Sequence, residues 1–196
     1  MKTRQWIFCG FLTLLTSLSG GLAHADESDS NDITPPFRRY EVTLSGGTAL
    51  QTGYLTSKRS EGTYDVGLNF RTPRGLLSVE WQGFNANHNT GEFDLANNTS
   101  VSVATISLIS HFQVFETEKW RFYLGLGVSD IFLSQTNPTY QLSYGTVIFS
   151  GMIEYQFCER WAAFYKTQWY NMEQTLAGET TTFEVWSHLV GVGFNF

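Results

Sequence analysis

Apolar and polar side chains alternate along most of the chain after residue 39, and the alternation is clearest in residues 183–196. Counting back from Phe196 in twos gives a mostly large and apolar series, while the residues between are small or polar. A period of two places successive side chains on opposite faces of a strand. This last segment is therefore predicted to be a β-strand with one apolar and one polar face.

The same pattern recurs in seven earlier segments, separated alternately by short turns and longer polar connections. Short turns are expected near residues 73, 117 and 159, and long loops at 53–62, 85–99, 134–143 and 171–182. Short periplasmic turns and longer extracellular loops are typical of outer-membrane barrels. We therefore predict an all-β fold: an eight-stranded antiparallel up-and-down transmembrane β-barrel over residues 40–196, with both termini in the periplasm.

Residues 101–114 give the least clear of the eight strands. One face is predicted to be outward and apolar, with Ala104, Ile106, Leu108 and Phe112. The opposite face is predicted to carry Thr105, Ser107, His111 and Gln113. The apolar residues Val103 and Ile109 then fall on the otherwise polar face.

The first 39 residues have the composition of a targeting segment followed by a leader. A basic start at residues 1–4, an apolar stretch at 6–18 and the motif Ala23-His24-Ala25 predict a signal peptide over residues 1–25, cleaved after Ala25. Residues 26–39 contain acids, Ser, Asn and two prolines, and too little apolar surface to order themselves. They are predicted to form a disordered periplasmic leader.

Net charge and cysteine content bear on the partners and on the covalent chemistry that can be expected. Removing Lys2 and Arg4 from the 12 basic residues leaves 10 against 18 acidic ones, a net charge of −8, which argues against a nucleic-acid partner. Cys158 is then the one remaining cysteine, so no disulfide within the chain is expected. We interpret it as an inert turn residue, and we expect neither a cofactor nor a metal.

The polar faces of the strands carry charges of both signs, which the facing pattern places inside the barrel. These residues are Glu41, Asp65, Arg71, Glu80, Arg121, Glu154 and Lys166. The interior of an eight-stranded barrel is filled by side chains, and buried charges are normally paired. We therefore predict an ion-pair and hydrogen-bond network in the lumen. The alternative is a proton or ion path.

Aromatic residues gather near both ends of the predicted strands, as expected for two girdles at the membrane interfaces. One girdle is predicted to contain Trp120 and Trp161. The other is predicted to contain Tyr54, Trp81, Tyr144, Trp169, Tyr170 and Trp186.

The segment Arg121–Val128 and the ending Val192-Gly193-Phe194-Asn195-Phe196 resemble the small OmpA/OmpX/OmpW-type outer-membrane barrels. The resemblance implies that a terminal aromatic with alternating apolar residues is read by the barrel-assembly machinery. That signal is Phe196, Phe194, Val192 and Val190. The family has no shared catalytic residues. We further expect contact with outer-membrane lipid and lipopolysaccharide, an extracellular ligand or host surface at the loops, and a monomer.

Lipid A deacylases share this barrel type, and their pattern places a His and a Ser two residues apart on one strand. Here Ser110-His111 and Ser187-His188 are adjacent, so each pair points to opposite faces. His88 is expected in a loop, and no His and acid residues have metal-ligand spacing. A nucleophile and base on different strands stay open as an alternative.

Three functions follow in order of preference. The first is a non-enzymatic outer-membrane barrel with a structural, adhesion or host-contact role. The second is a lipid-A acyl hydrolase on the same fold. The third is a secreted lipocalin-like ligand-binding barrel, which would need its apolar faces turned inward around a cavity.

Overall fold

The computed structural model describes residues 40–53, 61–88, 99–136, 139–176 and 179–196, so the predicted signal peptide and leader lie outside the described residues. The described part contains eight strands. They are β1 (Tyr40–Gly53), β2 (Glu61–Thr72), β3 (Gly75–His88), β4 (Thr99–Glu116), β5 (Trp120–Thr136), β6 (Thr139–Gln156), β7 (Trp161–Leu176) and β8 (Glu179–Asn195). No helix among these residues is long and apolar enough to cross a membrane.

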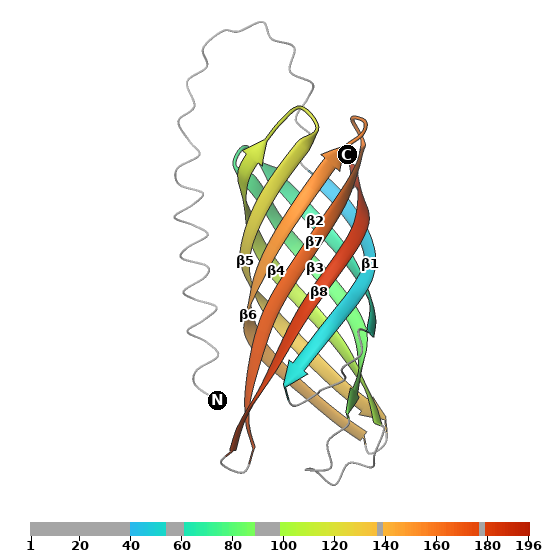
Figure 1. Cartoon of the computed structure of the whole chain (residues 1–196), viewed down its shortest axis with the longest axis vertical. Coiled ribbons are helices and arrows are strands. Elements are labelled where there is room, and N and C mark those ends of the chain that lie inside the picture. Colours follow the sequence, from blue (N-terminus) through green and yellow to red (C-terminus); the bar gives the residue numbers. More distant parts are fainter. Residues whose placement is uncertain (1–39, 54–60, 89–98, 137–138, 177–178) are drawn as a thin grey trace, which may run out of the picture. The chain divides into compact units, whose positions relative to one another are not determined.

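The strands form one closed antiparallel barrel in sequence order, as predicted (Figure 1). Strand β8 closes it by pairing with β1 from Glu41–Asn195 to Gly53–Phe183. The backbone N–H of Phe196 also donates to the carbonyl of Tyr40 at 2.9 Å. The start of β1 and the end of β8 therefore lie at one end, together with the short β2–β3, β4–β5 and β6–β7 connections. We call this the turn end, and the opposite end the hairpin end.

The strand faces are the predicted ones, with apolar side chains outward and polar side chains inward. On β8 and β5 the outward Val190 and Leu124 are 66% and 61% exposed. On β3 the inward Glu80 is 4% exposed. An apolar exterior around a polar interior is the arrangement of a transmembrane barrel. It contradicts the lipocalin-like alternative, which needs the apolar faces inside.

Strand β4 also has the predicted outward face, with Ile106 and Phe112 each 50% exposed. Val103 and Ile109 do point inward, where they are 2% and 0% exposed. They belong to a cluster of buried apolar side chains inside the barrel. The cluster is Ala49, Phe84, Val103, Ile109, Ile131, Leu133, Ile148, Tyr170 and Val185, with Tyr144 packed against it. We call it the apolar plug.

The three short turns are confirmed, but two of the predicted long loops are wrong. Strands β5 and β6 stay paired up to Thr136–Thr139, and β7 and β8 up to Leu176–Glu179, so the segments 134–143 and 171–182 are mostly strand. Strand β3 likewise continues to His88, which was expected in a loop. The alternation of apolar and polar residues weakens in these segments, although the backbone pairing continues through them.

Candidate functional site

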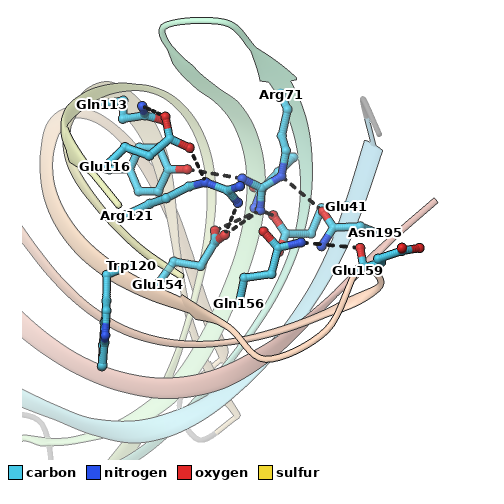
Figure 2. A network of polar contacts seen from close by, with 12 residues as sticks. Glu41, Arg71, Gln113, Glu116, Trp120, Arg121, Glu154, Gln156, Glu159 and Asn195 are labelled. Carbon is cyan, nitrogen blue, oxygen red and sulfur yellow. Dashed lines mark hydrogen bonds and ion pairs between the residues drawn. The ribbon is translucent and has the colours of Figure 1, made fainter. Parts of the chain in front are cut away.

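A cluster of ion pairs fills the lumen at the turn end, and its central residue is Arg71 of β2 (Figure 2). Its Nη2 lies 3.0 Å from Glu41 Oε2 and 2.8 Å from Glu154 Oε2. Its remaining groups donate to Asn195 Oδ1 and to the Tyr123 hydroxyl, each at 3.1 Å. One guanidinium thus joins strands β1, β2, β5, β6 and β8 through its fork of donors.

Arg121 extends this cluster toward the mouth of the barrel. Its Nη1 lies 3.0 Å from Glu154 Oε1, and its Nε lies 2.9 Å from Oε1 of the half-exposed Glu116. We call Glu41, Arg71, Glu116, Arg121 and Glu154 the turn-end cluster. Its two arginines balance the two buried carboxylates, while Glu116 meets solvent.

A second group, which we call the middle cluster, consists of Asp65, Glu80 and Lys166. Lys166 Nζ is 2.9 Å from Asp65 Oδ1 and 2.8 Å from Glu80 Oε2, and all three side chains are buried. Ser45 donates to Asp65 Oδ1 at 3.2 Å, and Gln168 donates to Glu80. The seven charged residues singled out by the sequence therefore lie in two separate groups, each drawn from several strands.

His111 of β4 lies inside the barrel between two serines that the sequence did not indicate. Its Nδ1 is 3.1 Å from Ser78 Oγ of β3, and its Nε2 is 3.1 Å from Ser150 Oγ of β6. A serine and a histidine within hydrogen-bond reach are a starting point for nucleophilic catalysis. Here, however, the imidazole is 2% exposed and a serine occupies each ring nitrogen. Within the described residues, the hydrogen-bond partners of the two ring nitrogens are these serines.

The apolar plug closes the lumen nearer the hairpin end. Tyr170 of β7 lies in it with 0% exposure, and its hydroxyl has no hydrogen-bond partner in the part of the chain that the structure describes. Tyr144 packs against the same cluster. Their predicted place in an interfacial girdle is therefore wrong. Both residues occupy inward positions of strands whose lipid-facing positions carry other side chains.

The other predicted girdle residues that can be placed do face outward. Trp120, Trp161, Trp81 and Trp186 are 42–46% exposed. The ring of Trp169 lies 6.1 Å from that of Trp186. Tyr54 lies outside the described residues.

The residues predicted as the assembly signal lie on the closing strand. Val190, Val192 and Phe196 point outward and are exposed, and the Phe194 ring packs against Trp161 at 5.0 Å. The Phe196 ring stacks on that of Tyr40 at 6.0 Å. Recognition of these residues by the assembly machinery stays a prediction.

The barrel wall divides at the hairpin end. Pairing between β6 and β7 stops at Ile148–Tyr170, yet β6 begins at Thr139 and β7 runs on to Leu176. Beyond that point β6 pairs with β5, and β7 pairs with β8. The two hairpins, which we call the free hairpins, are joined there by a hydrogen bond from Thr146 Oγ1 to the carbonyl of Asn171.

No group of three or more His, Cys, Asp or Glu side chains among the described residues has the arrangement of a metal site. Cys158 is exposed in the β6–β7 turn, as expected, and carries a free thiol.

The sequence matches no protein-family model and no curated protein. Solved structures do match. The crystal structure of Neisserial surface protein A is similar over 80% of this chain and 97% of that chain, with a TM-score of 0.66 and 12% identity. This similarity agrees with the closed barrel and the apolar exterior described above. The chain has the fold of the small eight-stranded outer-membrane β-barrels.

Two other bacterial outer-membrane proteins align over similar lengths with lower scores. The match to Ail of Yersinia pestis covers 98% of that chain and 81% of this one, with a TM-score of 0.48 and 10% identity. The match to the N-terminal barrel domain of Pseudomonas aeruginosa OprF covers 97% of that chain and 80% of this one, with a TM-score of 0.47 and 14% identity. The comparison of fold rests on the first structure.

Proposed function

We propose that the chain is a non-enzymatic outer-membrane protein that contacts its surroundings through the free hairpins. The observation that carries this proposal is the early end of the β6–β7 pairing at Ile148–Tyr170. Strands β4 to β8 have 16–18 residues, whereas a tilted strand needs about 9–11 to cross a membrane. The excess length extends beyond the apolar band, where it is free to meet a partner.

The outward side chains of the strands also support contact through the hairpin end. Outward polar side chains are present toward the hairpin end, namely Asp130 on β5, Asn171 on β7 and Glu184 on β8, next to the outward Phe132. Short turns face the periplasm in outer-membrane barrels, and the longer connections face outside. The proposed orientation therefore places the turn end in the periplasm and the free hairpins at the cell surface.

The edge of β6 that faces the gap is suited to pairing with another chain. Residues 139–147, Thr-Tyr-Gln-Leu-Ser-Tyr-Gly-Thr-Val, contain no charged residue and no proline. Edge strands of monomeric proteins are usually protected by such residues, because an open edge is a template for strand addition. A partner that presents an extended segment would add a strand here through main-chain hydrogen bonds.

Adherence of bacteria to an epithelial monolayer tests this role. Gly145→Lys adds a protecting charge on the gap edge, where the nearest atom to a built Cβ is Asp130 Oδ1 at 3.5 Å. Ser134→Lys is the matched control, since its strand is paired on both sides. An otherwise non-adherent strain should gain adherence with the wild-type chain and with Ser134→Lys, but not with Gly145→Lys. Equal adherence of both variants would contradict the proposed surface.

The enzymatic alternative has a direct test in the composition of lipid A. Cells with and without the protein should contain identical lipid A by mass spectrometry, because the Ser and His groups that meet are enclosed in the barrel. Loss of an acyl chain that depends on the protein, and that disappears in Ser78→Ala or Ser150→Ala, would replace the non-enzymatic role with an acyl hydrolase.

A further inference from the structure

The buried charges of the lumen do not balance, and the imbalance lies in the middle cluster. In the turn-end cluster Arg71 and Arg121 match Glu41 and Glu154. In the middle cluster two carboxylates share the single ammonium of Lys166. All three of these side chains are at most 4% exposed, so one net negative charge would be buried away from water. An isolated buried charge is costly and is normally neutralised.

The hydrogen bonds of Asp65 are equally incomplete. Its Oδ1 accepts from both Lys166 and Ser45, whereas its buried Oδ2 has no hydrogen-bond partner among the described residues. A buried carboxylate oxygen without a donor loses the hydrogen bonds it would make in water. The excess charge and the missing donor thus point to the same carboxyl group.

A second unpartnered acceptor lies directly opposite on the neighbouring strand. Asp65 of β2 and Gln82 of β3 are register partners, and both side chains point inward. The Cβ atoms of such partners are about 4.5–5.5 Å apart. The Oε1 of Gln82 is also buried, and no group in the described strands hydrogen-bonds to it.

The hydrogen bonds around Gln82 determine the orientation of its amide group, and therefore that the atom without a partner is the oxygen. Thr63 uses its hydroxyl hydrogen to donate to the Gly83 carbonyl at 3.1 Å. Its Oγ1 can therefore only accept, and it accepts from Gln82 Nε2 at 3.1 Å. The same Nε2 donates to Ser187 Oγ at 2.8 Å. Rotating the amide would place two acceptors together, so Oε1 stays turned away from Thr63.

We propose that the middle cluster binds one proton, carried on Asp65 Oδ2 and donated to Gln82 Oε1. A single proton taken up from solvent satisfies both orphan acceptors and cancels the excess charge. Lys166 and the ionised Glu80 then remain as a neutral pair, with the neutral carboxylic acid of Asp65 beside them. The charged or titratable groups in or near this site are Glu80 on β3, Lys166 on β7 and His111 on β4.

Infrared spectroscopy of the folded protein in detergent at neutral pH tests this site. A protonated carboxyl group has a C=O stretching band that an ionised carboxylate lacks. The wild-type chain should have one such band, and Asp65→Asn should lose it while folding normally, because the amide supplies a donor in place of the O–H. Exposed Glu118 provides the control, and Glu118→Gln should keep the band.

A second variant locates the proton. Gln82→Leu removes the acceptor, so the band should remain and move to higher frequency. An unmoved band would place the proton on Glu80 and contradict the assignment to Asp65. Absence of the band in the wild-type chain, with or without added sodium, would overturn the proposal in favour of a bridging water or a bound cation. Migration of the unheated protein in gels confirms that each variant is folded.

Discussion

Arg71 is the single residue on which the turn-end cluster depends most. It is 8% exposed and contacts two buried carboxylates. Removing one partner of a buried ion pair leaves the other charge without compensation, at a cost of about 3–5 kcal/mol. Arg71→Met is therefore expected to lower the free energy of unfolding by about that amount in urea titrations with lipid vesicles.

Arg121→Met is the matched control for this experiment. Its side chain is 22% exposed, and water screens part of its interaction with Glu116 and Glu154. A clearly smaller loss of stability is expected. Equal losses for the two variants would show that burial of Arg71 does not govern the strength of its ion pairs.

The alternation of apolar and polar residues predicted which charged side chains point inward, but not which of them contact one another. The period of two places Asp65, Glu80 and Lys166 on inner faces, yet their contact depends on the register of β2, β3 and β7 across the closed barrel. The Ser78–His111–Ser150 contacts have the same origin, because the three residues come from three strands. Tyr170 was misplaced because an apolar plug accepts aromatic side chains as readily as a lipid interface does.

Strand β5 carries small residues at inward positions where its neighbour approaches closely. A Cβ built on Gly127 would overlap the backbone carbonyl of Leu108 on β4. Overpacking of a core costs roughly 1–3 kcal/mol when side chains can move, and backbone cannot move as easily. Gly127→Val is expected to prevent folding, so that the chain migrates as the unfolded form in unheated gels.

The outward Gly46 of β1 provides the comparison for this substitution. The nearest atom to a Cβ built there is the Thr63 carbonyl oxygen at 3.7 Å, an ordinary contact distance. Gly46→Val should therefore fold and insert like the wild-type chain. A folded Gly127→Val barrel would indicate that the strands can separate locally to make room.

At the level of whole elements, the sequence predicted eight strands and their facing, but not their length. The amphipathic signal depends on one face meeting lipid, so it fades beyond the apolar band. The pairing of β5 with β6 and of β7 with β8 continues past that limit because backbone hydrogen bonds need no particular side chains. The division between β6 and β7 has no counterpart in the sequence pattern.

The whole barrel is expected to be closed to solutes. The turn-end cluster, the middle cluster and the apolar plug fill the lumen with buried side chains. Purified protein in planar lipid bilayers should therefore produce no stable channel currents. Reproducible single-channel steps from the wild-type chain would contradict a filled lumen and favour the alternative of an ion path.

A charged side chain on the lipid-facing surface is expected to impair folding into a membrane. Leu124→Arg places a cation on the lipid-facing surface, where arginine costs about 2–4 kcal/mol near the bilayer midplane. Gly145→Arg places it on an outward position beside the carboxylate of Asp130, with which the cation can pair. Folding into vesicles should be impaired by the first and unaffected by the second, and equal yields would contradict a lipid-facing position for Leu124.

The most direct test of the membrane barrel is a scan of lipid exposure along β5 in vesicles. Single spin-labelled cysteines from Phe122 to Asp130, in a Cys158→Ser background, would report access to oxygen in lipid and to a nickel chelate in water. Oxygen access should be high at Phe122, Leu124, Leu126 and Val128 and low between them, with chelate access low at the same four outward positions. Inverted alternation, or chelate access at every outward position, would contradict a barrel that presents its apolar face to the membrane.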